Sequence, residues 1–210
     1  MTHSTIKTLR THWDDICDGD LPPFRSDIAP RTMPDVLDTL FILEQLSPDD
    51  TRVRIAGLKI CEMMGMEVRG QSPMSFFQDN ARGRFDNILA EVLGQPKIAY
   101  LGLDTDDKLG NTNHVEMVLL PLRSDFGDIS RIIGCVTVPD NGFTAPIRYY
   151  ISSVDMENPF KDRPSDQQGF AEPDSGFSME GAPTLRSIDG NTALKPRKRS
   201  EKPSWIKLVD

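Results

Sequence analysis

The sequence lacks any apolar run long enough to cross a membrane as a helix. It has 210 residues, of which 38% are hydrophobic, and its apolar stretches fall well short of the about 20 residues that a spanning helix needs. The N-terminal stretch MTHSTIKTLRTHWDD also lacks an apolar signal region, so we expect no export. The hydrophobic share suffices for one core but is lean for the whole length, which predicts that part of the chain lies outside the core.

Cysteine is scarce as well. Cys17, Cys61 and Cys135 are widely separated and form no C-x-x-C pair. This spacing argues against a disulfide framework or a zinc knuckle and fits a reducing compartment, so we predict a cytoplasmic protein with no bound metal. The net charge is −8, and this negative charge opposes binding of the main body to the phosphates of nucleic acid.

Motifs of known catalytic chemistry are missing too. The chain has no G-x-S-x-G elbow, no H-E-x-x-H motif and no phosphate-binding P-loop. The turn-rich stretch DTDDKLGN (104–111) lacks the central glycine and the twelfth-position glutamate of a calcium-binding loop. We therefore predict that the protein is not an enzyme.

The composition changes near residue 152. Residues 152–210 are rich in Ser, Pro, Gly, Asp and Lys and keep no period of 2 or 3.6 residues, so they are predicted to form a disordered tail after a single domain over 5–140. The tail carries a basic cluster, KPRKR (195–199), which is typical of a solvated charge run; contact with nucleic acid or an anionic membrane surface is the alternative. The apolar end at 205–209 fits either a linear docking motif or a short helix that folds back on the sheet.

Residues 5–140 divide into short helices and strands. Hydrophobic spacing predicts helices over 6–17, 58–65 and 80–93, and strands over 41–46, 52–57, 97–103, 114–122 and 130–138. Two strands, a helical middle and three strands joined by turns indicate an α+β fold. We expect one mostly antiparallel five-stranded sheet with helices packed on one face.

This order of elements resembles the PAS domain, and the motifs resemble a PAS-type family of alphaproteobacteria long catalogued as a domain of unknown function. The similarity rests on a tryptophan-bearing N-terminal helix, the loop LPPFRSDIAP (21–30), the strand RVRIAG (52–57) and the strand motif LLPL (119–122). It implies a PAS-like sheet around a small cavity and a sensory or protein-interaction module without catalysis. For some relatives it implies a link to motility or cell-cycle control.

The N-terminal helix offers a candidate dimer surface. In PAS proteins such flanking helices often pair between subunits, so the resemblance implies a homodimer through this helix. We expect Trp13 at its centre, because aromatic anchors dominate small interfaces. The predicted dimer residues are Ile6, Leu9, Trp13 and Ile16.

The loop over 21–30 offers Arg25 and Asp27 as structural or recognition residues. A guanidinium can clamp a carboxylate, and an aspartate can cap a neighbouring turn. We expect this pair to fasten the N-terminal helix to the sheet, with Arg54 meeting either Asp27 or Glu44 across the sheet. Recognition of a ligand or partner is the alternative.

Large, flexible apolar side chains gather in the helical middle, where a PAS fold walls its cavity. Methionine adapts to irregular gaps and accommodates varied ligands, but a cluster of this kind also fits a plain core. The sequence favours the plain core without excluding a pocket. The candidate pocket residues are Met63, Met64, Phe76, Phe77, Phe85, Leu89 and Met117.

No cofactor is predicted. A haem needs an axial ligand, most often histidine, and His3, His12 and His114 all lie outside the helical middle. A flavin photoadduct needs a reactive cysteine in an Asn-Cys-Arg setting, which the surroundings of Cys61 lack. We therefore expect a non-catalytic regulatory module that acts through protein partners; a sensor that binds a small molecule in the PAS cavity is the alternative.

Overall fold

The structure is a computed structural model that describes residues 3–106, 110–139 and 142–160. All the helices and strands predicted above are present, with ends shifted by a few residues. Within the described residues, no helix is both long and apolar enough to span a membrane. In chain order the elements are α1 (Ser4–Asp15), the 3-10 turns η1 (Arg25–Asp27), η2 (Pro30–Thr32) and η3 (Pro34–Thr39), β1 (Leu40–Ser47), β2 (Asp50–Ala56), α2 (Leu58–Met64), η4 (Pro73–Phe76), α3 (Asp79–Gly94), β3 (Ile98–Asp106), β4 (Thr112–Arg123), β5 (Ile129–Val136) and β6 (Tyr150–Glu157).

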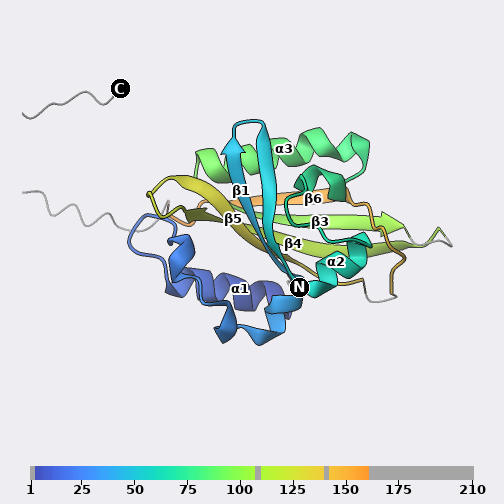
Figure 1. The fold of residues 1–210 in the computed structure, drawn as a ribbon, viewed down its shortest axis with the longest axis horizontal. Coiled ribbons are helices and arrows are strands. Elements are labelled where there is room, and N and C mark those ends of the chain that lie inside the picture. Colours follow the sequence, from blue (N-terminus) through green and yellow to red (C-terminus); the bar gives the residue numbers. More distant parts are fainter. Residues whose placement is uncertain (1–2, 107–109, 140–141, 161–210) are drawn as a thin grey trace, which may run out of the picture. The chain divides into compact units, whose positions relative to one another are not determined.

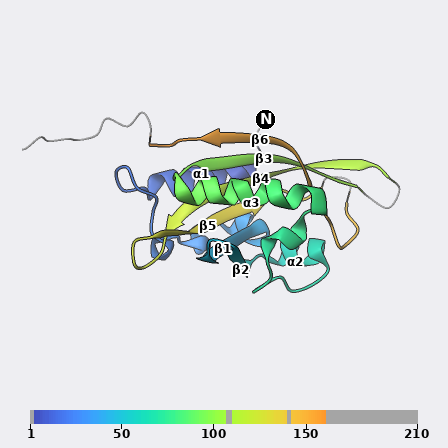
Figure 2. The same ribbon diagram turned by 90° about the horizontal axis from the view of Figure 1, so that it is seen from above.

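The strands form one antiparallel sheet in the order β2-β1-β5-β4-β3-β6, which can be followed from one edge to the other in Figure 2. The β1–β2 hairpin and the β3–β4–β5 meander join where β5 pairs with β1. This topology confirms the predicted fold class. In the part of the chain that the structure describes, however, the sheet has six strands and not five.

The sixth strand corrects the predicted domain boundary. β6 pairs with β3 from Ile98↔Glu157 to Asp104↔Tyr150, so residues 152–157 belong to the sheet and the prediction of disorder from residue 152 is wrong for them. The sequence pattern missed β6 because an edge strand is held mainly by backbone hydrogen bonds and needs little apolar periodicity. The basic cluster at 195–199 and the apolar end at 205–209 lie outside the described residues.

The sheet separates two apolar cores, because successive side chains of each strand point to opposite faces. On β4, Met117 and Leu119 belong to the core under α2, η4 and α3, whereas Val118 and Leu120 belong to the core under α1. Figure 1 shows α3 and α1 on opposite sides of the sheet. The expectation of helices on one face therefore holds for α2 and α3, while the N-terminal helix covers the other face.

Close packing at the centre of the sheet depends on Gly134 of β5. A Cβ at this position would lie 2.4 Å from the carbonyl oxygen of Val118 and 2.5 Å from the ring of Phe41. No side chain larger than hydrogen fits there without moving backbone. The glycine thus allows the Phe41 ring to lie across β5, in the core that contains the predicted pocket residues.

Candidate functional site

The structure places the predicted pocket residues together in one closed layer between the sheet and the helical middle. None of the seven is more than 5% exposed. The Phe77 and Phe85 rings stack with centroids 4.0 Å apart, and all seven side chains belong to the same apolar core. The members of this layer are Met63, Met64, Phe76, Phe77, Phe85, Leu89 and Met117.

Two residues that sequence reasoning missed complete this layer. Ile147 and Tyr149 precede β6, and both are buried in the same core. The backbone N–H of Ile147 donates to the Met63 carbonyl at 2.9 Å, and that of Tyr149 donates to the Phe76 carbonyl at 2.9 Å. The Tyr149 hydroxyl lies 3.6 Å from the Met63 sulfur, and burial raises the pKa of Tyr149. Only the strand-like spacing of Ile147 and Tyr149 hinted at this role.

The predicted dimer stripe faces the sheet of its own chain. Ile6, Leu9 and Trp13 are each at most 1% exposed, and the Trp13 indole N–H donates to the Pro121 carbonyl at 2.9 Å. Ile16 is half-buried and packs on the same core. Three of these four side chains are used up by the core of their own chain, so the choice of this stripe, with Trp13 at its centre, as an interface is wrong. Dimerisation itself stays a prediction and needs another surface.

The loop residues act more locally than predicted. The Asp27 carboxylate accepts a hydrogen bond from the Phe24 backbone N–H at 3.1 Å, so it caps its own 3-10 turn. Arg54 pairs with Glu44, one of its two predicted partners, and Glu44 also accepts from Arg131 at 2.9 Å. Among the described residues, neither Arg25 nor Asp27 forms a salt bridge with the sheet.

Arg123 of β4 takes over the fastening role expected of that loop. Its guanidinium donates to the Pro22 carbonyl at 2.6 Å and lies 3.9 Å from the centroid of the Phe24 ring. Its backbone N–H donates to the Pro23 carbonyl at 2.9 Å. The loop is thus attached through its carbonyls and its aromatic ring. The prediction considered only charged partners for this loop and therefore missed these groups.

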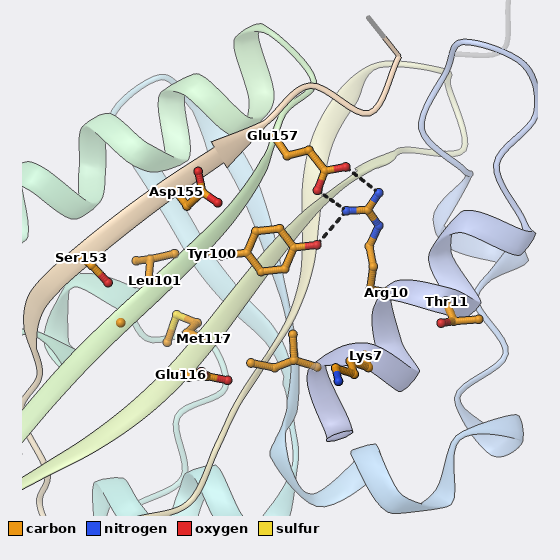
Figure 3. Close-up of a pocket in the computed structure, with 12 residues that line it drawn as sticks. Lys7, Arg10, Thr11, Tyr100, Leu101, Glu116, Met117, Ser153, Asp155 and Glu157 are labelled. Atoms are coloured by element: carbon orange, nitrogen blue, oxygen red, sulfur yellow. Dashed lines mark hydrogen bonds and ion pairs between the residues drawn. The ribbon is translucent and has the colours of Figure 1, made fainter. Parts of the chain in front are cut away.

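A second candidate site lies on the other face of the sheet, between α1 and the strands β3, β4 and β6 (Figure 3). It is a hollow of about 590 Å³. Its lining mixes charged and apolar side chains, and it adjoins a smaller hollow of about 360 Å³ that also contains Gly102 and Glu116. The polar side chains in its wall include Lys7, Arg10, Tyr100, Glu116, Ser153, Asp155 and Glu157.

Gly102 of β3 creates the floor of this hollow. A Cβ at Gly102 would lie 2.4 Å from the Ser153 hydroxyl oxygen, so a larger residue would displace this hydroxyl and fill part of the hollow. A glycine inside a strand often marks a close approach of this kind. The register places Glu116, Gly102 and Ser153 side by side on β4, β3 and β6.

Arg10 of α1 is the centre of the polar contacts in this wall. Its guanidinium donates to both carboxylate oxygens of Glu157, at 2.6 and 2.9 Å, to the Tyr100 hydroxyl at 2.7 Å and to Asp14 at 2.8 Å. Figure 3 shows Arg10 reaching from the helix to Glu157 on β6 and to Tyr100 on β3. The forked geometry is the one in which arginine binds a carboxylate most strongly.

The charges of this cluster reinforce one another. Burial by itself lowers the pKa of Arg10, but the hydrogen bonds with Glu157 and Asp14 outweigh it, and the pKa of Arg10 is raised. The hydrogen bond from Arg10 lowers the pKa of Glu157 despite the opposing effect of burial. Burial raises the pKa of Tyr100, so its hydroxyl stays protonated. The cluster therefore keeps Arg10 and Glu157 as an ion pair near neutral pH, and Asp14 is a second carboxylate on the same guanidinium.

Comparison with known proteins gives one family match and likenesses to solved structures. The family model of the PAS domain matches residues 1–137. A solved light-oxygen-voltage domain, from a study with a flavin analogue, is 15% identical, with a TM-score of 0.41 over 53% of this chain and 84% of that chain. The dark structure of the blue-light photoreceptor Aureochrome1 LOV is 15% identical, with a TM-score of 0.39 over 60% of this chain and 91% of that chain.

No curated protein matches the chain. The family match covers the N-terminal helix, the 21–30 loop and all the strands from β1 to β5. These are also the segments whose motifs carried the resemblance in the sequence. On this match, the chain belongs to the PAS domain family.

Proposed function

We propose that this chain is a non-catalytic regulatory module that acts through contacts with other proteins in the cytoplasm, in signalling or in cell-cycle or motility control. PAS domains are commonly signalling or sensor modules and are generally non-catalytic. The observation that carries the proposal is the packing of the helical middle. Where a PAS domain could hold a ligand, the seven predicted pocket residues are at most 5% exposed.

Opening this layer for a ligand would be costly. Ligand pockets typically have about 300–1,000 Å³, so at least one of the rings of Phe77, Phe85 and Tyr149 would have to leave the core. Removing a buried phenylalanine from its contacts costs about 3–5 kcal/mol, which a small ligand would first have to offset. A signal that arrives through the protein surface does not meet this cost.

Mass spectrometry under native conditions tests the proposal. Freshly purified full-length protein is measured natively and after denaturation, and the two masses are compared. We expect equal masses, corresponding to the chain without a small molecule. A retained molecule that is released only on denaturation would overturn the proposal in favour of a ligand sensor.

The alternative, a small-molecule sensor, is favoured by one observation, the hollow of about 590 Å³ between α1 and β6. If a ligand is retained, two variants locate it. Gly102→Ala adds a methyl group to the floor of this hollow, whereas Phe85→Ala changes only the core on the other face. Loss of the ligand in Gly102→Ala alone would place it in the hollow, and loss in Phe85→Ala alone would place it in the PAS core.

The proposal also includes a role for the C-terminal residues, which lie outside the described residues. The apolar end at 205–209 would serve as a linear docking motif for a partner. Deletion of residues 204–210 is then expected to weaken partner binding without changing the unfolding temperature of the domain. A lower unfolding temperature after this deletion would instead show that the end belongs to the fold.

A further inference from the structure

β6 is attached to the domain differently from the other strands. None of its eight residues is buried, whereas each of the other five strands buries at least two. It pairs with β3 alone, at the edge of the sheet. Only Ile151, Val154 and Met156 reach the core beside α3, and each is half-buried. The middle of the strand therefore contributes little apolar burial to its own attachment.

The strong attachments of β6 lie at its two ends. At the first end, Tyr149 is fully buried, its N–H donates to Phe76, and its carbonyl accepts from the Gln78 N–H at 3.0 Å. At the second end, Arg10 of α1 holds Glu157 through two hydrogen bonds of 2.6 and 2.9 Å. Just beyond the strand, the Phe160 ring lies 6.0 Å from the Trp13 ring, also on α1.

A bulge separates these two ends. Gly102 pairs with Ser153 and Leu103 pairs with Ile151, so Ser152 is the extra residue on β6. A bulge interrupts the backbone ladder at this point. Residues 153–160 can therefore leave β3 as a unit while Tyr149 stays in the core, once their backbone pairing with β3, the core contacts of Val154 and Met156, and the contacts with Arg10 and Trp13 are broken.

We propose that residues 153–160 form a displaceable strand, and that the β3 edge beneath it is a docking surface for an extended segment of a partner protein. A partner would add as a strand, with backbone hydrogen bonds to β3. The present occupant defines the chemistry that the surface selects. A segment that binds here needs two apolar side chains at alternate positions, as in Val154 and Met156. It also needs a following carboxylate for Arg10 and, three residues later, an aromatic ring for Trp13.

Competition, and not protonation, is the trigger that fits this site. The hydrogen bond from Arg10 lowers the pKa of Glu157, so the carboxylate stays charged near neutral pH and the ion pair does not open by titration there. A second carboxylate on an extended segment can take the same guanidinium fork. The proposal deepens the proposed protein-contact function by naming the class of partner. It can fail while native mass spectrometry still finds no ligand.

Hydrogen exchange on the full-length protein tests the first half of the proposal. Glu157→Gln removes the charge that Arg10 holds, and Asp155→Asn is the matched control, since it lies on the same strand and face and has no ion pair among the described residues. We expect amide exchange over 153–157 to become at least tenfold faster in Glu157→Gln only, with β4 and β5 unchanged. Unchanged exchange over 153–157, or equal acceleration throughout the sheet, would overturn it.

Peptide binding tests the second half. The probe is a fluorescent peptide with the sequence of residues 150–160, YISSVDMENPF, and its control carries glutamine at the position of Glu157. In the Glu157→Gln protein, Arg10 is released from its pair with Glu157 and can bind the carboxylate of the probe. We expect this protein to bind the probe at least tenfold more tightly than wild type does, and at least tenfold more tightly than it binds the control peptide.

The Arg10→Gln protein supplies the decisive comparison. Its β6 is released as well, but it lacks the guanidinium, so we expect it to bind the two peptides equally within twofold. Failure of Glu157→Gln to bind the probe better than wild type would refute the docking surface. Preference for the glutamate peptide that persists in Arg10→Gln would refute the role assigned to Arg10.

Discussion

Replacement of Trp13 by alanine separates a core role from an interface role. The side chain is fully buried in one chain, and its indole N–H donates to the Pro121 carbonyl at 2.9 Å. Removal of a buried tryptophan costs about 3–5 kcal/mol, and the carbonyl left without its donor accounts for about 1 kcal/mol of this. For a chain of this size, such a loss lowers the unfolding temperature by about 6–20 °C.

Thermal unfolding followed by circular dichroism measures this effect, and light scattering at the same protein concentration measures the mass. Trp13→Phe keeps an aromatic ring but loses the donor, so we expect a smaller fall, corresponding to about 1–2 kcal/mol. Leu21→Ala, at a position that is 49% exposed, is the control and is expected to change the stability by less than about 0.5 kcal/mol. An unchanged unfolding temperature of Trp13→Ala together with a halved mass would refute the burial argument and restore the helix as a dimer interface.

Three further predictions follow from the contacts described above. Asp27→Ala is expected to cost only about 1 kcal/mol, because the exposed carboxylate caps a single turn; a loss of about 3 kcal/mol in urea unfolding would show that Asp27 has a partner in the sheet after all. The pKa of Glu157 is lowered in the folded state, so its stabilisation of β6 is complete above the ordinary glutamate value and is lost as the pH falls through the lowered one. The protection of the amides over 153–157, measured relative to their intrinsic exchange rates at each pH, should therefore fall in acid in wild type but much less in Glu157→Gln. Burial raises the pKa of Cys135 to about 12, so this thiol should react with a disulfide reagent only after denaturation, and labelling of Cys135 in the native protein, located by peptide mass spectrometry, would contradict its burial.

The sequence by itself determined the regular elements that depend on local pattern. Helix and strand periods are properties of a few neighbouring residues, so α3 and the strands β1 to β5 could be predicted nearly to their ends. The motifs of the 21–30 loop and of β2 and β4 were enough to identify the family. The same local patterns showed that α1 has an apolar face, but they could not show what this face contacts.

Contacts between distant parts of the chain were decided only by the tertiary structure. The Met63 region forms a closed core because Ile147 and Tyr149 arrive from the segment before β6 and pack on it. No residue pattern within the helical middle indicates that these two residues pack on it. The pattern therefore left a pocket and a filled core as alternatives, and the burial of these side chains supports the filled core that we propose.

β6 shows most clearly why the sequence alone could not place such contacts. The contacts at its C-terminal end join Glu157 to Arg10 across 147 positions of sequence, and Phe160 to Trp13 across a similar separation. A charged residue on an exposed strand looks the same in sequence whether it meets water or a guanidinium. Local composition therefore assigned residues 152–157 to the tail. Their place in the sheet comes from the forked ion pair with Arg10 and from backbone hydrogen bonds to β3, and both need α1 and β3 to be folded first.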